Sequence, residues 1–376
     1  MLQRLYINNF RCLENFELKL QGMPSALLIG KNGAGKSTIA SALEVLQKIS
    51  RGINRMRELE KLKLISPKDF ARGKSDVPIR FEIEVLLNDK LYKYVLAFDL
   101  PEKFRELRVF EEQLLVSGEP IYSRKEAQVT LHTSSSQQNR EAQFRVDWHL
   151  VALPVIQEQS ETDPLHIFKT WLARTIILAP IPSLMTGDSN GETLEPKRDG
   201  SNFGEWVSGL LSRYPAAYTQ VDKYLREVMP DIQDFLNELI GKDSKSMIVR
   251  FEANNANLSI EFNDLSDGEK CFFLGAVVLA ANKFYGPLFC FWDEPDNYLS
   301  LSEVGHFVMS LRRSFKNSGQ ILVTSHNPEA IRKFSNENTF LLYRNSHLEP
   351  TLVRPLSEMS VKGDLINRLI GDDIEL

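Results

Sequence analysis

One eight-residue run restricts the possible folds of this chain more than any other feature. Residues 30–37 read GKNGAGKS and match the pattern G-x-x-x-x-G-K-[ST] in full. The run follows an apolar stretch, residues 26–29, and precedes apolar positions at helical spacing, among them Ile39, Leu43 and Leu46. A strand, a glycine-rich turn and a helix in this order are the context in which the pattern forms a phosphate-binding loop. The sequence therefore predicts an α/β fold built around such a loop.

The residues of this loop have defined expected roles. Glycines allow backbone amides to turn inward around phosphate groups, and the N-terminus of the following helix adds a partial positive charge. Lys36 is expected to reach the β- and γ-phosphates of ATP, and Ser37 to ligate Mg²⁺. The alternative, a glycine turn without a ligand, is disfavoured by the flanking strand and helix. The predicted nucleotide-binding residues of the loop are Gly30, Asn32, Gly33, Gly35, Lys36, Ser37 and Thr38.

Two carboxylates follow a second apolar stretch far along the chain. Residues 288–292 read as a buried strand that ends in Asp293 and Glu294. A carboxylate at the end of a buried strand is costly unless it serves a cation. We therefore expect Asp293 to be a Mg²⁺ ligand and Glu294 to act on the attacking water. The alternative, an exposed acidic turn, fits poorly with the aromatic and apolar residues before it.

A histidine stands at the end of a third apolar stretch, residues 320–325. A lone histidine such as His326 is more often structural than catalytic. Its position favours the catalytic interpretation, because it ends the strand after the one that carries Asp293, and the carboxyl ends of strands in open α/β sheets line the ligand crevice.

Composition limits the class of protein. Of the 376 residues, 43% are hydrophobic and 25% are charged, which is typical of a globular chain. The net charge of -5 provides no overall basic field, so any contact with DNA would need a local patch. Apolar runs such as residues 274–281 fall far short of the roughly 20 residues of a membrane helix, and polar residues interrupt the apolar ones at the N-terminus. We expect a cytoplasmic protein without a membrane partner.

The three cysteines, Cys12, Cys271 and Cys290, have no metal-site or disulfide spacing and are expected to be buried thiols.

The chain is expected to fold as an ATPase lobe with insertions. Residues 1–75 are predicted to form the N-terminal part of the lobe, whose basic stretch from residue 51 is interpreted as a solvated helix face rather than a DNA patch. Residues 76–150 carry short alternating segments and predict an inserted antiparallel β region, with a loop tip at residues 132–140. Residues 151–245 are predicted to be a mainly helical insertion, and residues 246–376 to complete the lobe.

The order of these motifs resembles that of ABC-type ATPases. Residues 265–270, LSDGEK, are similar to the signature of that family and precede Asp293 at the usual short distance. The resemblance implies a P-loop NTPase head with a mixed sheet and a head-to-tail homodimer. In that dimer Ser266, Gly268 and Glu269 of one subunit would cap the γ-phosphate held by the other. It also implies that Glu294 is the catalytic base and His326 the switch histidine.

Within that family the chain resembles SMC-like and OLD-like heads. The opening LYINNFR at residues 5–11 is similar to the start of those heads, and the resemblance implies that Arg11 lies near the nucleotide phosphates. The stretch DEPDNYL at residues 293–299, with DGSN at residues 199–202, resembles compact bacterial OLD-like ATPases, several of which work in anti-phage defence. OLD nucleases also carry a Toprim domain, but only about 50 residues follow His326, so we expect no nuclease activity in this chain.

The resemblance leaves several functions open. The leading expectation is an ATP-driven switch that controls an effector partner, a nuclease or toxin, or acts on DNA, as a dimer or a larger assembly. Alternatives are a repair or chromosome-maintenance ATPase of the SMC or RecF type, a transporter subunit, or a scaffold that hydrolyses ATP slowly. Sustained heptads, which long coiled-coil arms would need, are absent from the sequence. Ser300 stands where transporter-type proteins have an aspartate, and no glutamine can be assigned to a Q-loop.

Overall fold

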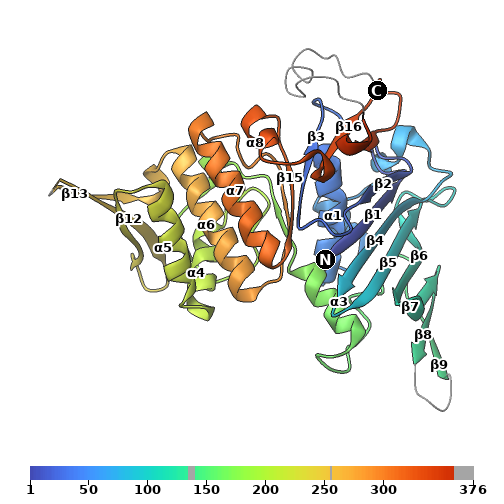
Figure 1. Ribbon diagram of the computed structural model, residues 1–376. Helices are drawn as coiled ribbons and strands as arrows, with labels where there is room; N and C mark the ends of the chain where they lie inside the picture. The colour runs from blue at the N-terminus through green and yellow to red at the C-terminus, as the bar shows by residue number, and fades with distance from the viewer. Residues whose placement is uncertain (134–139, 255, 360–376) are drawn as a thin grey trace. The chain divides into compact units, whose positions relative to one another are not determined.

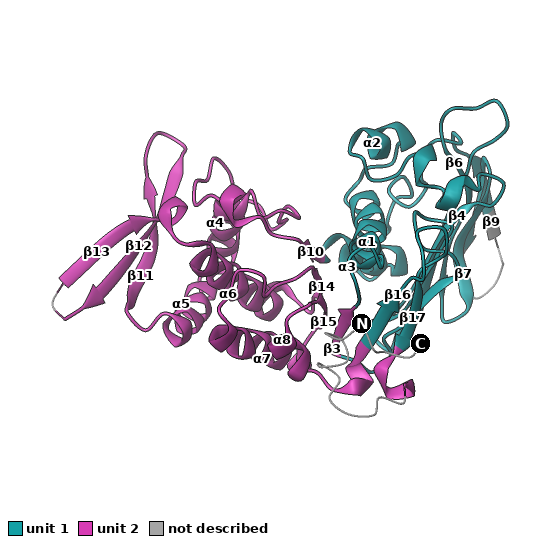
Figure 2. Cartoon of the chain, turned by 90° about the horizontal axis from the view of Figure 1, so that it is seen from above, with its two compact units in different colours: residues 1–23, 30–175, 340–354 teal, residues 24–29, 176–339, 355–376 magenta. Residues whose placement is uncertain are grey.

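The computed structural model describes residues 1–133, 140–254 and 256–359 (Figure 1). It divides into two compact units, shown in different colours in Figure 2. Unit 1 comprises residues 1–23, 30–175 and 340–354, and unit 2 comprises residues 24–29, 176–339 and the described residues from 355 onward. The chain therefore passes repeatedly from one unit to the other.

An antiparallel sheet of eight strands dominates unit 1, in the order β2-β1-β4-β5-β6-β7-β8-β9. Alternating apolar residues give it one buried face, which includes Leu5, Phe81 and Tyr94. The opposite face carries ion pairs between strands, such as Arg80 of β4 with Glu111 of β6 at 2.6 Å. The strands are β1 (Leu2–Asn8), β2 (Phe16–Lys19), β4 (Ile79–Leu87), β5 (Lys90–Asp99), β6 (Arg108–Val116), β7 (Glu119–Lys125), β8 (Gln128–Thr133) and β9 (Arg140–Arg145).

Helices pack on the apolar face of this sheet. Phe168, in the middle of α3, contacts the rings of Tyr92 and Tyr94 on β5 at centroid distances of 6.2 and 5.5 Å. The helix α1 is joined to the end of α3, since Gln47 donates a hydrogen bond to the Thr175 carbonyl. The remaining elements of unit 1 are α1 (Lys36–Ser50), α2 (Met56–Lys61), α3 (Pro164–Ala173), most of β16 (Thr339–Tyr343) and β17 (Leu352–Pro355).

A parallel sheet with strand order β10-β14-β15-β3 lies at the centre of unit 2. These strands are continuous apolar runs, as expected of strands buried on both faces. On one face Phe307 of α7 meets Trp292 of β14 edge to face, with the ring centroids 5.6 Å apart. The strands are β3 (Ser25–Ile29), β10 (Ile176–Leu178), β14 (Phe289–Trp292) and β15 (Gln320–Thr324).

Helices and a small sheet complete unit 2. The helix α6 packs between α5 and α7, and an antiparallel sheet of order β11-β12-β13 contributes Phe235, whose ring meets that of Phe273 on α6. The elements are α4 (Phe203–Arg213), α5 (Ala217–Val228), β11 (Ile232–Leu239), β12 (Lys245–Ala253), β13 (Ala256–Glu261), α6 (Asp267–Tyr285), α7 (Leu301–Asn317) and α8 (Pro328–Arg332).

The structure differs from the sequence expectations in three places. Residues 232–239 form the strand β11 and not a helix, because their apolar side chains pair across to β12. The basic stretch from residue 51 contains only the short α2, followed by irregular chain and 3-10 turns. Cys271 and Cys290 are buried, but Cys12 is partly exposed.

Most of the predicted loop tip, residues 134–139, lies outside the described residues. Among the residues that are described, no helix combines the length and the apolar character needed to cross a bilayer.

Candidate functional site

The glycine-rich run forms a tight loop between β3 and α1. Gly30, Gly33 and Gly35 have φ angles of 153°, 80° and 98°, a region that glycine adopts without strain. A Cβ atom on Gly30 would lie 2.2 Å from the Leu342 carbonyl oxygen, so no other residue fits there. Gly35 is the N-cap of α1 and makes no side-chain hydrogen bond to the helix. The N-terminus of α1 therefore follows the loop directly, and a helix N-terminus carries a partial positive charge that favours an anion.

Lys36 lies at the centre of this loop. It is 6% exposed, and its ammonium group donates hydrogen bonds to the carbonyl oxygens of Gly30 at 2.6 Å and Lys31 at 3.3 Å. An ammonium group held inside the loop by its own backbone is well placed to meet an anion that the loop encloses. Ser37 and Asn32 are exposed on the loop, and Thr38 is partly exposed.

The turn between β1 and β2 contacts the loop, and both belong to unit 1. The Cys12 sulfur is 3.0 Å from the position of a Cβ on Gly35, and the Cys12 thiol donates a hydrogen bond to the Thr38 hydroxyl at 3.6 Å. The neighbouring residue, Arg11, stacks on the Phe10 ring and forms an ion pair with Asp69 at 2.8 Å. The arginine predicted to approach the phosphates thus directly precedes a residue that contacts the loop, and it is held by a carboxylate.

Asp293 and Glu294 lie at the carboxyl end of β14 in unit 2. The backbone amide of Asp293 donates to the Leu178 carbonyl of β10 at 2.7 Å. On the other side, the Thr324 hydroxyl at the end of β15 donates to Asp293 Oδ1 at 2.6 Å and accepts from the Glu294 amide at 2.9 Å. Both carboxylates are partly exposed at the edge of a fully buried strand, as expected of groups that meet a ligand.

The Glu294 carboxylate is held by two side chains of unit 2. His326 Nε2 lies 3.4 Å from one carboxylate oxygen, and the Asn297 amide donates to the other at 2.5 Å. Glu294 itself has a φ angle of 51°, in the left-handed region that non-glycine residues rarely adopt. Such backbone conformations persist only where their surroundings enforce them, and they are frequent at functional sites.

Asp296 is a buried carboxylate directly beyond this pair. It is 3% exposed, and one oxygen accepts a hydrogen bond from the Ser325 hydroxyl at 2.9 Å, while the other has no hydrogen-bond partner. Burial raises the pKa of Asp296 to about 6, and the nearby Glu294 charge acts in the same direction. The same Ser325 hydroxyl accepts from the Asn327 amide at 2.9 Å, so it also fixes the turn that carries His326.

The residues similar to the ABC signature begin the long helix α6. Ser266 is its N-cap and forms a capping box with Glu269: the Ser266 hydroxyl accepts from the Glu269 amide at 3.4 Å, and the Glu269 carboxylate accepts from the Ser266 amide at 2.8 Å. A Cβ on Gly268 would lie 3.1 Å from the Tyr298 carbonyl oxygen, so the start of α6 packs closely on the segment after Glu294. Ser300, which begins α7, is likewise an N-cap, with Glu303 as its partner.

The predicted site residues thus form one group in each unit. Arg11 and the loop residues 30–38 belong to unit 1, and the signature residues, the two carboxylates and His326 belong to unit 2. Within unit 2, Leu28 of β3 pairs with Thr324 of β15, so the strand from which the loop departs ends at the same edge as the carboxylates. The roles of Thr324, Asp296, Asn297 and Asp69 were not predicted, although Asp296 and Asn297 lie within the DEPDNYL stretch, because burial and side-chain hydrogen bonds are not visible in the sequence.

The donor set agrees with Mg²⁺ bound together with a nucleotide. Among the described residues, no cluster of three or more histidine, cysteine or acidic side chains could hold a metal alone. Mg²⁺ is usually held by one or two carboxylates, with water and substrate phosphates completing its shell. Asp293 in unit 2 is a carboxylate of that kind, and Ser37 in unit 1 offers a hydroxyl.

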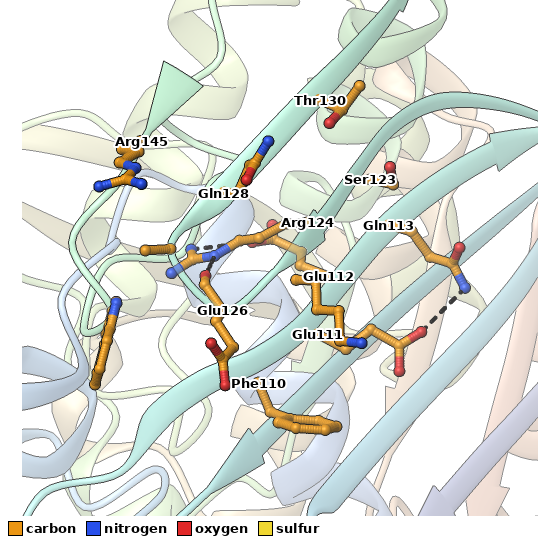
Figure 3. A pocket seen from close by; sticks show the side chains of 13 residues that line it. Phe110, Glu111, Glu112, Gln113, Ser123, Arg124, Glu126, Gln128, Thr130 and Arg145 are labelled. Atoms are coloured by element: carbon orange, nitrogen blue, oxygen red, sulfur yellow. Dashed lines mark hydrogen bonds and ion pairs between the residues drawn. The ribbon is translucent and has the colours of Figure 1, made fainter. Parts of the chain in front are cut away.

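A separate pocket of about 960 Å³ lies on the unit 1 sheet, over β6, β7 and β8 (Figure 3). Its deepest groups, Glu112 and Arg124, are fully buried and engaged with the protein itself. Glu112 accepts hydrogen bonds from Tyr94, Tyr122 and the amides of residues 152 and 153. Arg124 donates to the carbonyls of residues 126, 147 and 150. This network fastens the chain after β9 to the sheet and is structural.

Comparison with known proteins connects these features to a family. The model of the family described as "AAA domain, putative AbiEii toxin, Type IV TA system" matches residues 25–332. An OLD nuclease of Thermus scotoductus is 48% identical over 46 residues, covering 12% of this chain and 8% of that protein. A phosphonates import ATP-binding protein, PhnC of Bacillus cereus, is 30% identical over 97 residues, covering 26% of this chain and 37% of that protein. The chain thus matches well under half the length of either relative.

Solved structures with a similar fold include heads of SMC proteins. An SMC head bound to the C-terminal winged-helix domain of ScpA has a TM-score of 0.52 at 12% identity, covering 95% of this chain and 99% of that one. The head from Pyrococcus furiosus, with an extended coiled coil and bound to the C-terminal domain of ScpA, has a TM-score of 0.53, also at 12% identity, with coverage of 95% and 97%. These likenesses confirm the predicted fold, a P-loop NTPase head.

Proposed function

Because this chain belongs to that AAA-domain family of P-loop ATPases, we propose that it binds ATP with Mg²⁺, hydrolyses it and uses the cycle as a conformational switch. The observation that carries the proposal is the geometry around Glu294, whose carboxylate is held by Asn297 and His326 beside Asp293. A glycine turn alone would support binding. A supported carboxylate pair at the end of a buried strand supports hydrolysis as well.

The residues of the chain have distinct roles in this proposal. Lys36 and the first amides of α1 bind and orient the phosphates, and Arg11 approaches them from the neighbouring turn. Asp293 and Ser37 would hold Mg²⁺, which would supply neutralisation of charge on the phosphate oxygens. Glu294 accepts the proton of the attacking water, and His326 and Asn297 keep its carboxylate in position.

We further propose that two copies assemble head to tail around ATP. Ser266, Gly268 and Glu269 of one copy would then complete the phosphate site of the other. ATP-bound and ATP-free states would differ in this assembly, and that difference would control a partner, either an effector protein such as a nuclease or toxin, or DNA. The matches to an OLD nuclease and to the family described with a type IV toxin–antitoxin system support a role in bacterial defence.

The experiment that tests the proposal compares wild type with Glu294→Gln. We would measure ATP hydrolysis and the mass of the assembly in solution, with and without ATP. Wild type should hydrolyse ATP, whereas Glu294→Gln should bind ATP, lose turnover and accumulate as a dimer. Glu337→Gln, which alters an exposed glutamate, is the matched control and should behave as wild type. Full turnover by Glu294→Gln would refute its role as the base.

A second candidate is DNA maintenance of the SMC or RecF type, favoured by the similarity to SMC heads over nearly the whole chain. The same assay distinguishes the candidates when duplex DNA is added. Stimulation of wild-type turnover by DNA would favour DNA maintenance. A turnover rate that DNA does not change would favour control of an effector protein.

A further inference from the structure

A single buried hydroxyl connects both carboxylate residues of the candidate site. Thr324 is the last residue of β15 and is 0% exposed. Its hydroxyl donates to Asp293 Oδ1 at 2.6 Å and accepts from the Glu294 amide at 2.9 Å. One hydroxyl thus fixes the side chain of one residue and the backbone of the next. We infer that Thr324 is a positioning residue for ATP hydrolysis, an inference that rests on the proposed function.

The fold brings Thr324 to this place through strand register. Val323 pairs with Trp292 in the parallel sheet, so the residues after them, Thr324 and Asp293, end their strands side by side. A hydroxyl has one proton and two lone pairs, so it can donate to Asp293 and accept from the Glu294 amide at the same time. No aliphatic side chain of the same size can do either.

Each of these two hydrogen bonds has a consequence for chemistry. The bond to Asp293 Oδ1 opposes rotation of that carboxylate and presents it to a cation in one orientation. The bond from the Glu294 amide stabilises a residue with a φ angle of 51°, and this backbone conformation sets the direction in which the Glu294 side chain leaves the strand. A metal ligand and a general base are therefore oriented by the same atom.

The neighbouring Ser325 shows that this task is specific to Thr324. The Ser325 hydroxyl also donates a hydrogen bond to a carboxylate, but that carboxylate belongs to the buried Asp296. It also accepts from the Asn327 amide, so it supports the turn of His326 rather than the carboxylate pair. The two successive hydroxyls thus support different parts of the site.

Thr324→Val tests the inference, because valine keeps the volume and removes both hydrogen bonds. We expect kcat to fall by about 10–100-fold, the usual effect of losing an outer partner of a metal ligand. The dissociation constant of Mg²⁺ from the ATP-bound protein, measured by calorimetric titration, should rise. The KM for ATP should stay within about twofold, because the phosphate loop is unchanged. Thr324→Ser keeps the hydroxyl and should restore most of the turnover.

Two further variants keep the test decisive. Thr339→Val removes another buried threonine hydroxyl, which donates to the Ser335 carbonyl at 2.8 Å, and should leave turnover unchanged. Thr324→Ala replaces the valine variant if that one does not fold. Wild-type turnover by Thr324→Val or Thr324→Ala, or equal losses in Thr324→Ser and Thr324→Val, would overturn the positioning role. Absence of Mg²⁺-dependent hydrolysis by wild type would instead overturn the proposed function.

Discussion

Asn297 donates a hydrogen bond of 2.5 Å to the Glu294 carboxylate from a position three residues further along the chain. The amide thereby limits the orientations of a side chain that is otherwise 30% exposed. Because a general base works only within hydrogen-bond reach of the proton that it abstracts, this restriction bears directly on turnover.

We expect Asn297→Ala to lower kcat by about tenfold, the loss expected from one such hydrogen bond to a charged group, with little change in the KM for ATP. Steady-state kinetics would measure both. Asn336→Ala, at an exposed position outside the site, is the control. A change in KM alone would show that Asn297 acts on nucleotide binding instead.

Lys36→Ala should abolish detectable ATP binding. The ammonium group is the main cation within the phosphate loop, and its removal leaves the phosphate charge without its strongest partner. Titration with a fluorescent ATP analogue would check this, with the exposed Lys316→Ala as the control. Unchanged affinity would refute the assignment of the loop.

Arg11→Ala should raise the KM for ATP by about tenfold, because a charge-assisted hydrogen bond contributes about 1.5–3 kcal/mol. Arg57→Ala is the matched control, since the Arg57 side chain is 74% exposed. Equal KM values in wild type and Arg11→Ala would show that Arg11 serves only its ion pair with Asp69.

The raised pKa of Asp296 predicts a pH-dependent stability. Its value of about 6, against 3.8 for an ordinary aspartate, means that the folded protein binds the proton more tightly than the unfolded chain. This stabilisation, on the order of 3 kcal/mol, is therefore complete below about pH 4 and is lost as the pH rises through about 6. Urea unfolding from pH 4 to pH 7 should show this loss in wild type relative to Asp296→Asn. Parallel profiles for the two proteins would contradict the prediction.

Removing one partner of the buried Glu112–Arg124 pair in the unit 1 sheet is expected to lower stability strongly and to leave the candidate site unchanged. Glu112→Ala leaves the fully buried Arg124 without its carboxylate and should lower the free energy of unfolding by about 3–5 kcal/mol. Glu111→Ala breaks a partly exposed ion pair with Arg80 and should cost about 1 kcal/mol or less. Denaturant titration compares the two, and equal losses would show that burial of the pair is not what matters.

Much of this architecture could be predicted from local sequence. The strand before the phosphate loop and the helix after it were predicted, because apolar periodicity and the glycine pattern are local signals. The strand β11 was missed, because Ile232 and Phe235 stand at a helical spacing, which the strand accommodates through a register shift between Ile232 and Asp234. Its partner β12 decides between helix and strand, and pairing partners are not visible in one segment.

The site shows the same division between local and long-range information. Glu294 and Lys36 belong to motifs, so their roles could be predicted. Thr324 offered only a hydroxyl at the end of an apolar run, and its importance depends on strand register across 31 residues. The burial of Asp296 could not be predicted, because the sequence does not distinguish a buried aspartate from an exposed one.

The interleaving of the two units has a consequence for how the chain is made. The strand β3, at residues 25–29, pairs with β15, at residues 320–324, while the residues on either side of β3 belong to unit 1. A ribosome releases β3 long before its partner exists, so the parallel sheet can close only after nearly 300 further residues have been added. Such pairing carries a high loop-closure entropy and folds slowly. Neither unit can be produced by cutting the chain once, and a nascent chain must keep β3, with its exposed apolar edge, from other partners during synthesis.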